Sequence, residues 1–259
     1  MSYQSLNVSD MCILKDLKRY VNLTLCKNIR VGEKKPIKYV AKCTKNEEKL
    51  ENNIMRARSK LYELSICNEW EYFVTLTIDQ KKYKRNDLEK YHRAFAQWIR
   101  NQNRIHNLNV KYLTVPELHA DGQNWHEHGF ILGIPEKCLK TYKMSDTVPQ
   151  YIKDKLNKGE IVYDWTGYRE KFGWSIVEPI RNHDAACKYM RKYITKDLSR
   201  SVSELGAHMY YASQGLERAK EVKRGILTKA PEKWDFENEY VKIKRIDKMA
   251  STAVADLIV

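Results

Sequence analysis

The chain lacks the sequence features of a membrane protein, of a secreted protein and of a nucleotide-hydrolysing motor. No apolar run approaches the ~20 residues that cross a bilayer, and no apolar signal segment stands near residue 1. The six cysteines are scattered, which argues against paired zinc-binding CxxC motifs and a dense disulfide framework. No Gly-x-x-x-x-Gly-Lys-Ser/Thr phosphate loop occurs. We therefore expect a cytoplasmic globular protein with reduced thiols.

The composition favours a polyanionic partner. The 259 residues contain 47 Lys and Arg against 33 Asp and Glu, a formal net charge of +14, and 42% of them are hydrophobic, enough for a core. Seventeen tyrosines and six tryptophans are interleaved with the basic residues, a mixture that suits stacking on unpaired bases. Nucleic acid is the partner that fits best, although a ribosome-associated or simply soluble basic protein has the same charge balance.

The N-terminal third of the chain predicts two strands and a helix. Segments 20–26 and 37–41 are apolar and β-branched and are separated by a Gly- and Pro-containing stretch, which favours a hairpin. Apolar residues recur at helical spacing over 46–67, beside a group of basic residues. Further along, the Lys-rich segment 136–170 is predicted to be an insertion outside the core, with a helix over 151–158.

The middle of the chain alternates between strand and helix patterns. β-branched and aromatic residues predict strands, one of them a buried central strand, and apolar residues at helical spacing predict two helices. An Asp-Gly turn between two of the strands predicts a hairpin. The strands are expected at 72–78, 110–118, 125–133 and 173–180, and the helices at 86–105 and from Asp184 onward.

Two histidines begin one of these strands. Because side chains alternate along a strand, His126 and His128 project from the same face, as metal-binding imidazoles can. The hairpin brings Glu117 beside them, and a set of two imidazoles and one carboxylate suits a divalent ion such as Mg²⁺ or Mn²⁺. His119 competes for the third position, or serves as an outer ligand or a DNA contact. A surface strand that merely carries two histidines is the alternative.

A second group of residues lies on the helix after Asp184. Tyr189, Tyr193 and Lys196 stand at i, i+4 and i+7, which places them on one helix face. From Arg181 to Arg200 the chain holds six basic residues and two aspartates, so the local charge of +4 is expected to attract phosphates and to favour ionised phenols. An amphipathic helix that buries two tyrosine rings is the alternative. The surrounding basic residues are Lys188, Arg191, Lys192 and Arg200.

Taken together, these motifs resemble those of the HUH endonuclease superfamily. The order is the strand Tyr72–Thr77, then Glu117 with His126 and His128, then the two tyrosines and Lys196. The resemblance covers residues 68 to 220 and is closest to rolling-circle replication initiators of small single-stranded DNA phages and plasmids. In most of that superfamily the residue between the histidines is bulky and apolar, whereas here it is Glu127, which either faces a polar layer or belongs to the site.

The resemblance implies a fold and a division into domains. It implies an α+β fold in which a central antiparallel sheet of about five strands, of the ferredoxin-like or RRM-like type, is flanked by helices. The catalytic domain is expected over 69–220, preceded by a hairpin and basic helix over 1–68 and followed by a tail over 221–259.

The resemblance also implies an activity. Tyr189 or Tyr193 would attack single-stranded origin DNA, leaving a 5′-phosphotyrosine and a 3′-hydroxyl primer, and the other tyrosine could cut again before the ends are rejoined. Lys196 and Lys192 would stabilise phenolate or phosphate, and Lys188, Arg191, Arg200 and His119 would contact DNA. A separate, host-encoded helicase and DNA polymerase would be needed in the bacterial cytoplasm. The alternatives are a relaxase, a single-strand transposase and a non-catalytic DNA-binding regulator.

Overall fold

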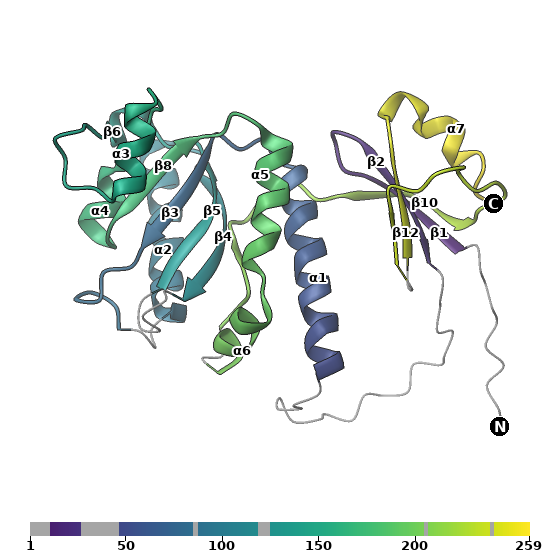
Figure 1. Ribbon diagram of the computed structural model, residues 1–259, viewed down its shortest axis with the longest axis horizontal. Coiled ribbons are helices and arrows are strands. Elements are labelled where there is room, and N and C mark those ends of the chain that lie inside the picture. The colour runs from purple at the N-terminus through teal and green to yellow at the C-terminus, as the bar shows by residue number, and fades with distance from the viewer. Residues whose placement is uncertain (1–10, 27–46, 85–87, 119–124, 205–206, 239–240) are drawn as a thin grey trace. The chain divides into compact units, whose positions relative to one another are not determined.

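The computed structural model describes residues 11–26, 47–84, 88–118, 125–204, 207–238 and 241–259, and it divides the chain into two compact units. Unit 1 consists of residues 1–45 together with 218–259, and unit 2 consists of residues 46–217. Each unit has its own sheet (Figure 1), and the strands of both sheets pair antiparallel. The chain is therefore an α+β protein, as the sequence predicts.

Unit 2 is built around a seven-stranded sheet with the order β6-β7-β8-β3-β5-β4-β9. Its strands are β3 (Tyr72–Thr77), β4 (Lys111–Leu118), β5 (Trp125–Leu132), β6 (Leu139–Thr141), β7 (Tyr163–Trp165), β8 (Ser175–Pro179) and β9 (Tyr211–Ala212). Its helices are α1 (Glu47–Ile66), α2 (Leu88–His106), α3 (Gln150–Asn157), α4 (Thr166–Lys171), α5 (His183–Met190) and α6 (Lys196–Glu204), with short 3₁₀ turns η2 (Glu136–Cys138) and η3 (Arg191–Tyr193).

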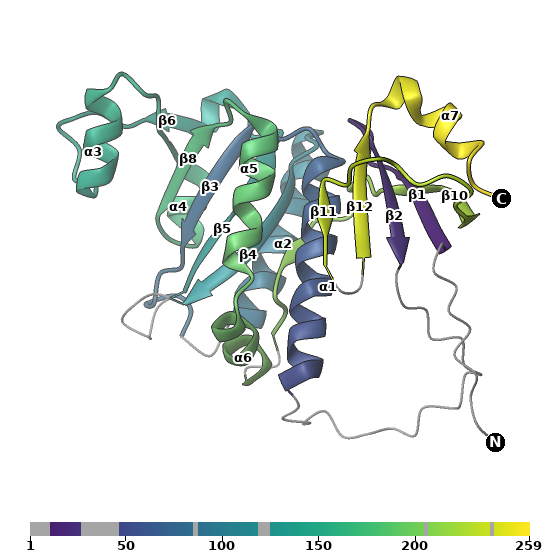
Figure 2. The same cartoon turned by 45° about the vertical axis from the view of Figure 1, so that its right-hand side comes forward.

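The two faces of this sheet are covered by different helices. On one face α2 and α4 pack with large aromatic side chains, and Tyr91, Phe95, Tyr168 and Phe172 are completely buried there. On the other face lie α5 and η3, with α1 beside them (Figures 1 and 2). Strand β3 is central, as its run of aromatic and β-branched residues predicts.

Strands β4 and β5 approach each other closely at Gly129. A Cβ atom at this position would stand 2.2 Å from the carbonyl oxygen of Leu113 and 2.7 Å from the Cα of Thr114. Real Cβ atoms do not come so close to a backbone, so only glycine fits here without moving a strand. Gly129 directly follows His128, and it therefore fixes the spacing of the strands that carry the candidate site.

The segment over 136–170 is more than an insertion, contrary to the sequence prediction. The expected helix is present as α3, but β6 and β7 extend the main sheet, and Tyr168 of α4 reaches the centre of the aromatic core. A smaller group of buried side chains, made by Tyr142, Ile152, Val162 and Ile176, joins α3 to the sheet. The lysines between these apolar positions concealed their pattern.

Unit 1 is a five-stranded sheet with the order β10-β1-β2-β12-β11. Its core contains Cys12, Leu14 and Leu23 from the N-terminal strands and Leu227, Ile246 and Ile258 from the C-terminal segment. The elements are β1 (Met11–Asp16), β2 (Val21–Cys26), β10 (Lys220–Ile226), β11 (Phe236–Glu237), β12 (Val241–Ile246), the 3₁₀ turn η4 (Lys248–Ala250) and α7 (Ser251–Ala255).

This division differs from the expected one at both ends of the chain. Helix α1 belongs to unit 2 instead of an N-terminal extension, and residues 221–259 supply strands of unit 1 instead of a separate tail. The predicted strand over 20–26 corresponds to β2, but its neighbours are β1 and β12; the predicted partner at 37–41 lies outside the described residues. Strand β1 was not predicted from the sequence.

The described cysteines are Cys12, Cys26, Cys67, Cys138 and Cys187, and all five are free thiols. None of the helices in the described parts of the chain has the length and apolar character that crossing a membrane requires.

Candidate active site

The pairing of β4 with β5 brings the predicted donor residues together. Glu117 stands directly opposite His126, and Nε2 of His128 lies 2.8 Å from Oε2 of Glu117. The ring centroids of the two histidines are 6.4 Å apart, and both rings project from the sheet face on which α5 and η3 lie. His119 lies outside the described residues.

Two threonines of β3 orient the histidine rings. Thr75 Oγ1 is 3.1 Å from Nδ1 of His128, and Thr77 Oγ1 is 2.9 Å from Nδ1 of His126. The register of β3 with β5 makes both contacts, because Thr75 is opposite His128 and Thr77 is opposite His126. The sequence analysis missed these threonines, although the pattern Thr-x-Thr on a central strand already places two hydroxyls on one face.

The chemistry of these donors fits a divalent metal ion. A histidine that binds a metal through Nε2 usually has its Nδ1 held by a hydrogen-bonding partner, as Thr75 and Thr77 provide here. Within the described residues, however, no three His, Cys, Asp or Glu side chains have the arrangement of a metal site. An ion held by these side chains would have to replace the direct contact between Glu117 and His128.

The candidate nucleophiles lie against the same histidine. The ring of Tyr193 stacks on His128 with a centroid distance of 4.3 Å and an interplanar angle of 12°. Tyr193 donates a 3.1 Å hydrogen bond to the hydroxyl of Tyr189. The ring of Tyr189 packs on its edge against Phe73, and 45% of Tyr189 is exposed. One tyrosine is therefore next to the donor set, and the other connects it to solvent.

The continuous helix expected through Lys196 is wrong. Helix α5 ends at Met190, η3 carries Tyr193, and Ile194 is extended, with φ −79° and ψ 92°. Helix α6 then begins at Lys196, and the Thr195 hydroxyl accepts a hydrogen bond from Leu198 N as an N-terminal cap. The two tyrosines remain neighbours, but Lys196 no longer shares a helix face with them. The β-branched pair Ile194-Thr195 was the sequence signal for this break.

The turn after Tyr193 is held in place from α1. The side chain of Ile194 is completely buried, and the Nε of Arg58 donates a 2.8 Å hydrogen bond to the Ile194 carbonyl oxygen. A carbonyl that follows an interrupted helix has no helical partner, so a guanidinium from a neighbouring helix satisfies it. A basic residue of α1 thus supports the position of Tyr193.

The environment of Tyr193 disfavours its ionised form, contrary to the expectation from local charge. Burial, the hydrogen bond with Tyr189 and the negative charges of Glu117 and Glu178 raise the pKa of the Tyr193 hydroxyl above its ordinary value. The sequence analysis counted basic residues along the helix, but Lys188 and Arg191 are exposed rather than packed against this hydroxyl.

The other predicted residues surround the site to different extents. The Lys192 ammonium lies 5.2 Å from the ring centroid of Tyr189, and the Arg191 guanidinium lies 5.5 Å from that of Tyr62. Lys188 is exposed on α5. The side chains of Lys196 and Arg200 lie outside the described part of the structure.

Glu127 does not belong to the site. It points to the opposite face of β5, is completely buried, and contacts Nε2 of His92 on α2. The His92 ring stacks on Tyr211. Neither carboxylate oxygen of Glu127 and neither ring nitrogen of His92 has a hydrogen-bonding partner in the part of the chain that the structure describes. Glu127 and His92 therefore form an isolated polar pair in the core.

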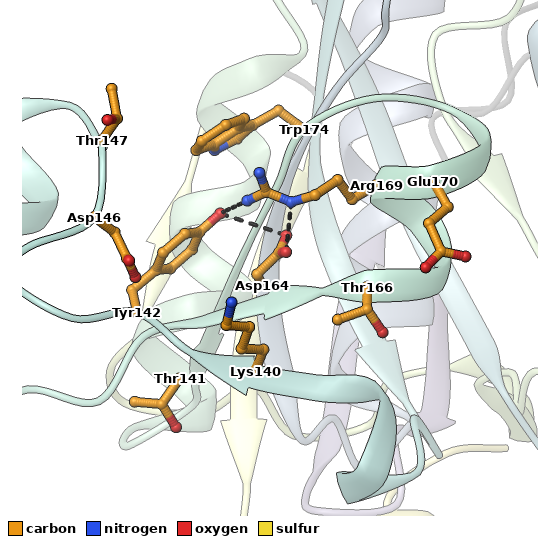
Figure 3. Close-up of a pocket in the computed structure, with 10 residues that line it drawn as sticks. All are labelled: Lys140, Thr141, Tyr142, Asp146, Thr147, Asp164, Thr166, Arg169, Glu170 and Trp174. Atoms are coloured by element: carbon orange, nitrogen blue, oxygen red, sulfur yellow. Dashed lines mark hydrogen bonds and ion pairs between the residues drawn. The ribbon is translucent and has the colours of Figure 1, made fainter.

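A hollow of about 420 Å³ between β6, β7 and α4 is the most enclosed group of charged residues away from this site (Figure 3). The Arg169 guanidinium lies 3.8 Å from the ring centroid of Trp174, and it donates to Asp164 and to the Tyr142 hydroxyl. Because Asp164 already pairs with this guanidinium, the hollow offers little unpaired positive charge to a phosphate. Its lining also contains Lys140, Asp146 and Glu170.

A tyrosine hydroxyl beside two oriented imidazoles and a carboxylate defines a candidate site for phosphoryl transfer. Residues 71–198 match the model of a family described as replication-associated protein, of the ORF2 type. The matched residues lie within unit 2 and include Glu117, both histidines and both tyrosines. No curated protein and no solved structure matches the chain. The family match supports a replication-associated protein with a role in DNA replication.

The threonine contacts predict a measurable loss of metal affinity. We expect Thr77→Val to weaken Mn²⁺ binding by about 10- to 100-fold, because the His126 ring loses the partner that orients it. Free Mn²⁺ measured by electron paramagnetic resonance during titration reports this affinity without requiring activity. Thr114→Val, on β4, is the matched control, since the Thr114 hydroxyl is buried without a hydrogen-bonding partner in the described structure. Equal affinities of wild type and Thr77→Val would contradict the expected role of Thr77.

Proposed function

We propose that unit 2 is an endonuclease that nicks single-stranded origin DNA and rejoins it during rolling-circle replication. The observation that carries this proposal is the stacking of Tyr193 on His128, whose Nε2 contacts Glu117. A nucleophile and a set of metal-binding side chains are thereby within reach of one phosphate. The match to a replication-associated family over these same residues supports the choice of DNA as substrate.

The proposed step is a transesterification. The Tyr193 oxygen attacks the phosphorus of a phosphodiester, the bond from phosphorus to the 3′ oxygen breaks, and the departing oxygen takes up a proton as a 3′-hydroxyl. The phenol proton leaves along the hydrogen bond to the partly exposed Tyr189 hydroxyl. The 5′ end stays bound to Tyr193, so the energy of the broken ester is kept for rejoining.

The environment of Tyr193 explains why help from a cation is needed. The neighbouring carboxylates and burial favour the neutral phenol, as the raised pKa of Tyr193 indicates. Glu117, His126 and His128 would hold a divalent ion, Mg²⁺ or Mn²⁺, whose charge would polarise the scissile phosphate. Lys192, next to the Tyr189 ring, and Lys196 are proposed to stabilise the phosphate or a phenolate.

Tyr189 is proposed to make the second cut. Its hydroxyl is only 3.1 Å from that of Tyr193, so both can reach the same phosphate region in turn. After one unit length is copied, attack by Tyr189 frees the strand held by Tyr193, and strand transfer closes the circle. A host-encoded helicase and DNA polymerase would supply unwinding and synthesis. A relaxase or single-strand transposase would use the same chemistry on different DNA.

The test is detection of a covalent adduct. Labelled single-stranded oligonucleotides that tile both strands of the encoding replicon are incubated with the full chain and separated on a denaturing gel. We expect one sequence to form an adduct with Mg²⁺ or Mn²⁺. EDTA should abolish this adduct, and adding the metal back should restore it.

The position of the linkage separates the alternatives. Nuclease digestion and mass spectrometry should find a 5′-phosphate on a tyrosine peptide that contains residues 189–193. Binding of the same oligonucleotides without any adduct across the replicon would overturn the endonuclease proposal in favour of a non-catalytic DNA-binding regulator. An adduct that forms equally well in EDTA would overturn the proposed role of the metal.

A further inference from the structure

A hollow of about 420 Å³ adjoins the tyrosines on the same face of the sheet. It is lined by Phe73 of β3, by Glu178 and Pro179 of β8, by Arg181 and by residues 159–161. Gly159 follows the end of α3 with a φ of +74°, and a side chain there would meet no atom within 4 Å. The turn made by this glycine thus leaves open space in front of the sheet.

Phe73 separates this hollow from the candidate nucleophiles by a single ring. Its ring centroid lies 5.8 Å from that of Tyr189 and 6.4 Å from that of His128. Glu178, directly opposite Phe73 on β8, is close enough to raise the pKa of Tyr193. A strand whose phosphate reaches Tyr193 would therefore present a neighbouring nucleotide to this hollow.

The walls of the hollow suit a base better than a phosphate. Phe73, Pro179 and the 52% exposed Ile161 offer flat or apolar surface for stacking. Two carboxylates, Glu160 and Glu178, also line it, and they would repel a phosphate but accept hydrogen bonds from an exocyclic amino group.

The two carboxylates are each held by a basic side chain. Glu178 pairs with Lys155, and Glu160 lies 3.5 Å from the Arg181 guanidinium. The Arg181 side chain is 69% exposed, so this ion pair is weak and the guanidinium can turn toward a phosphate at the rim. The volume falls within the range of pockets that enclose small ligands, and a purine fits in it.

We propose that this hollow binds one unpaired base next to the cleaved phosphodiester and selects adenine, cytosine or guanine over thymine. Thymine lacks the exocyclic amino group that Glu160 and Glu178 would accept. The proposal rests on the proposed endonuclease function, and it adds a specificity-determining subsite made by Phe73, Glu160, Ile161 and Glu178.

The experiment is an abasic scan of the cleaved oligonucleotide. One abasic position at a time is placed on either side of the mapped cleavage point, and the initial rate of adduct formation is measured. We expect one position near that point where loss of the base lowers the rate by about 10- to 100-fold. Thymine at that position should lower the rate as well, and the other three bases should not.

The variant Ile161→Ala assigns that position to the hollow. Because Ile161 is exposed, its truncation should leave the fold intact, and the abasic penalty at the one sensitive position should shrink to within about twofold. Ile105→Ala, which truncates another exposed isoleucine on α2, is the matched control and should keep the full penalty. An unchanged penalty in Ile161→Ala at every position would overturn the subsite.

Binding measurements separate this inference from the proposed function. The same abasic series is titrated by fluorescence anisotropy in EDTA, where no cleavage is expected. If the wild type forms an adduct but Ile161→Ala keeps every abasic penalty, the endonuclease stands and the subsite falls. If no adduct forms but one binding penalty disappears in Ile161→Ala, the base-binding hollow stands and the endonuclease falls.

Discussion

Replacing Tyr193 with phenylalanine is expected to lower the rate of the first strand cleavage by a factor on the order of 10³ or more. The phenylalanine ring can keep the stacking on His128, so the substitution removes the attacking oxygen with little other change. Tyr189→Phe should lower the first cleavage by less than about tenfold, because the Tyr189 hydroxyl does not lie against the donor set. Quenched-flow measurement of adduct formation checks both rates.

The strand-transfer reaction should show the opposite dependence on Tyr189. We expect Tyr189→Phe to form the first adduct and then to accumulate it, because no second nucleophile releases the bound strand. Tyr151→Phe, which changes another tyrosine with about half of its surface exposed, is the matched control and should behave as wild type. If Tyr189→Phe abolished the first cleavage while Tyr193→Phe preserved it, the assignment of the two tyrosines would be reversed.

Separating Glu127 from His92 is expected to lower the free energy of unfolding by about 3–5 kcal/mol. In Glu127→Leu the His92 ring stays buried without its polar partner, and in His92→Leu the carboxylate is left in the same state. Glu127→Leu also restores the apolar residue that most of the HUH superfamily has between the two histidines. A polar pair thus replaces an apolar contact behind the site.

The double variant His92→Leu with Glu127→Leu distinguishes this pair from ordinary core packing. We expect the double variant to regain most of the stability lost by either single variant, because no polar group is then left unpaired in the core. Urea denaturation of the three variants and the wild type, followed by circular dichroism, gives the coupling free energy. Additive losses would show that the two side chains do not depend on each other.

The sheet that carries the candidate site could be predicted from the sequence because its signals are local. The aromatic and β-branched run of β3 and the alternation in β5 predict both strands, and the short separation of β4 from β5 predicts their pairing. That pairing was enough to place Glu117 opposite His126. The helix α2 and the helix α1 were predicted for the same reason, since their apolar residues recur at helical spacing.

The features that the sequence analysis missed depend on contacts between distant residues. The side of the sheet that Glu127 occupies is decided by His92, a residue of another element, and the break after Tyr193 is stabilised by Arg58 of α1. The N-terminal strands find their outer partners beyond residue 218, and no local pattern encodes such a pairing. Hydrophobic periodicity cannot report contacts of this kind.

The discontinuity of unit 1 has a consequence for the order of events on the ribosome. Unit 2 is continuous in sequence and is complete once residue 217 has been made, whereas β1 and β2 must wait for β10 and β12. At about 5–20 residues per second, the interval between synthesis of β2 and of β12 is on the order of 10–40 s. During this time both outer edges of the β1–β2 hairpin lack the strands that later cover them. Unit 2 can therefore mature on the nascent chain, and closure of the small sheet marks that synthesis has passed residue 246.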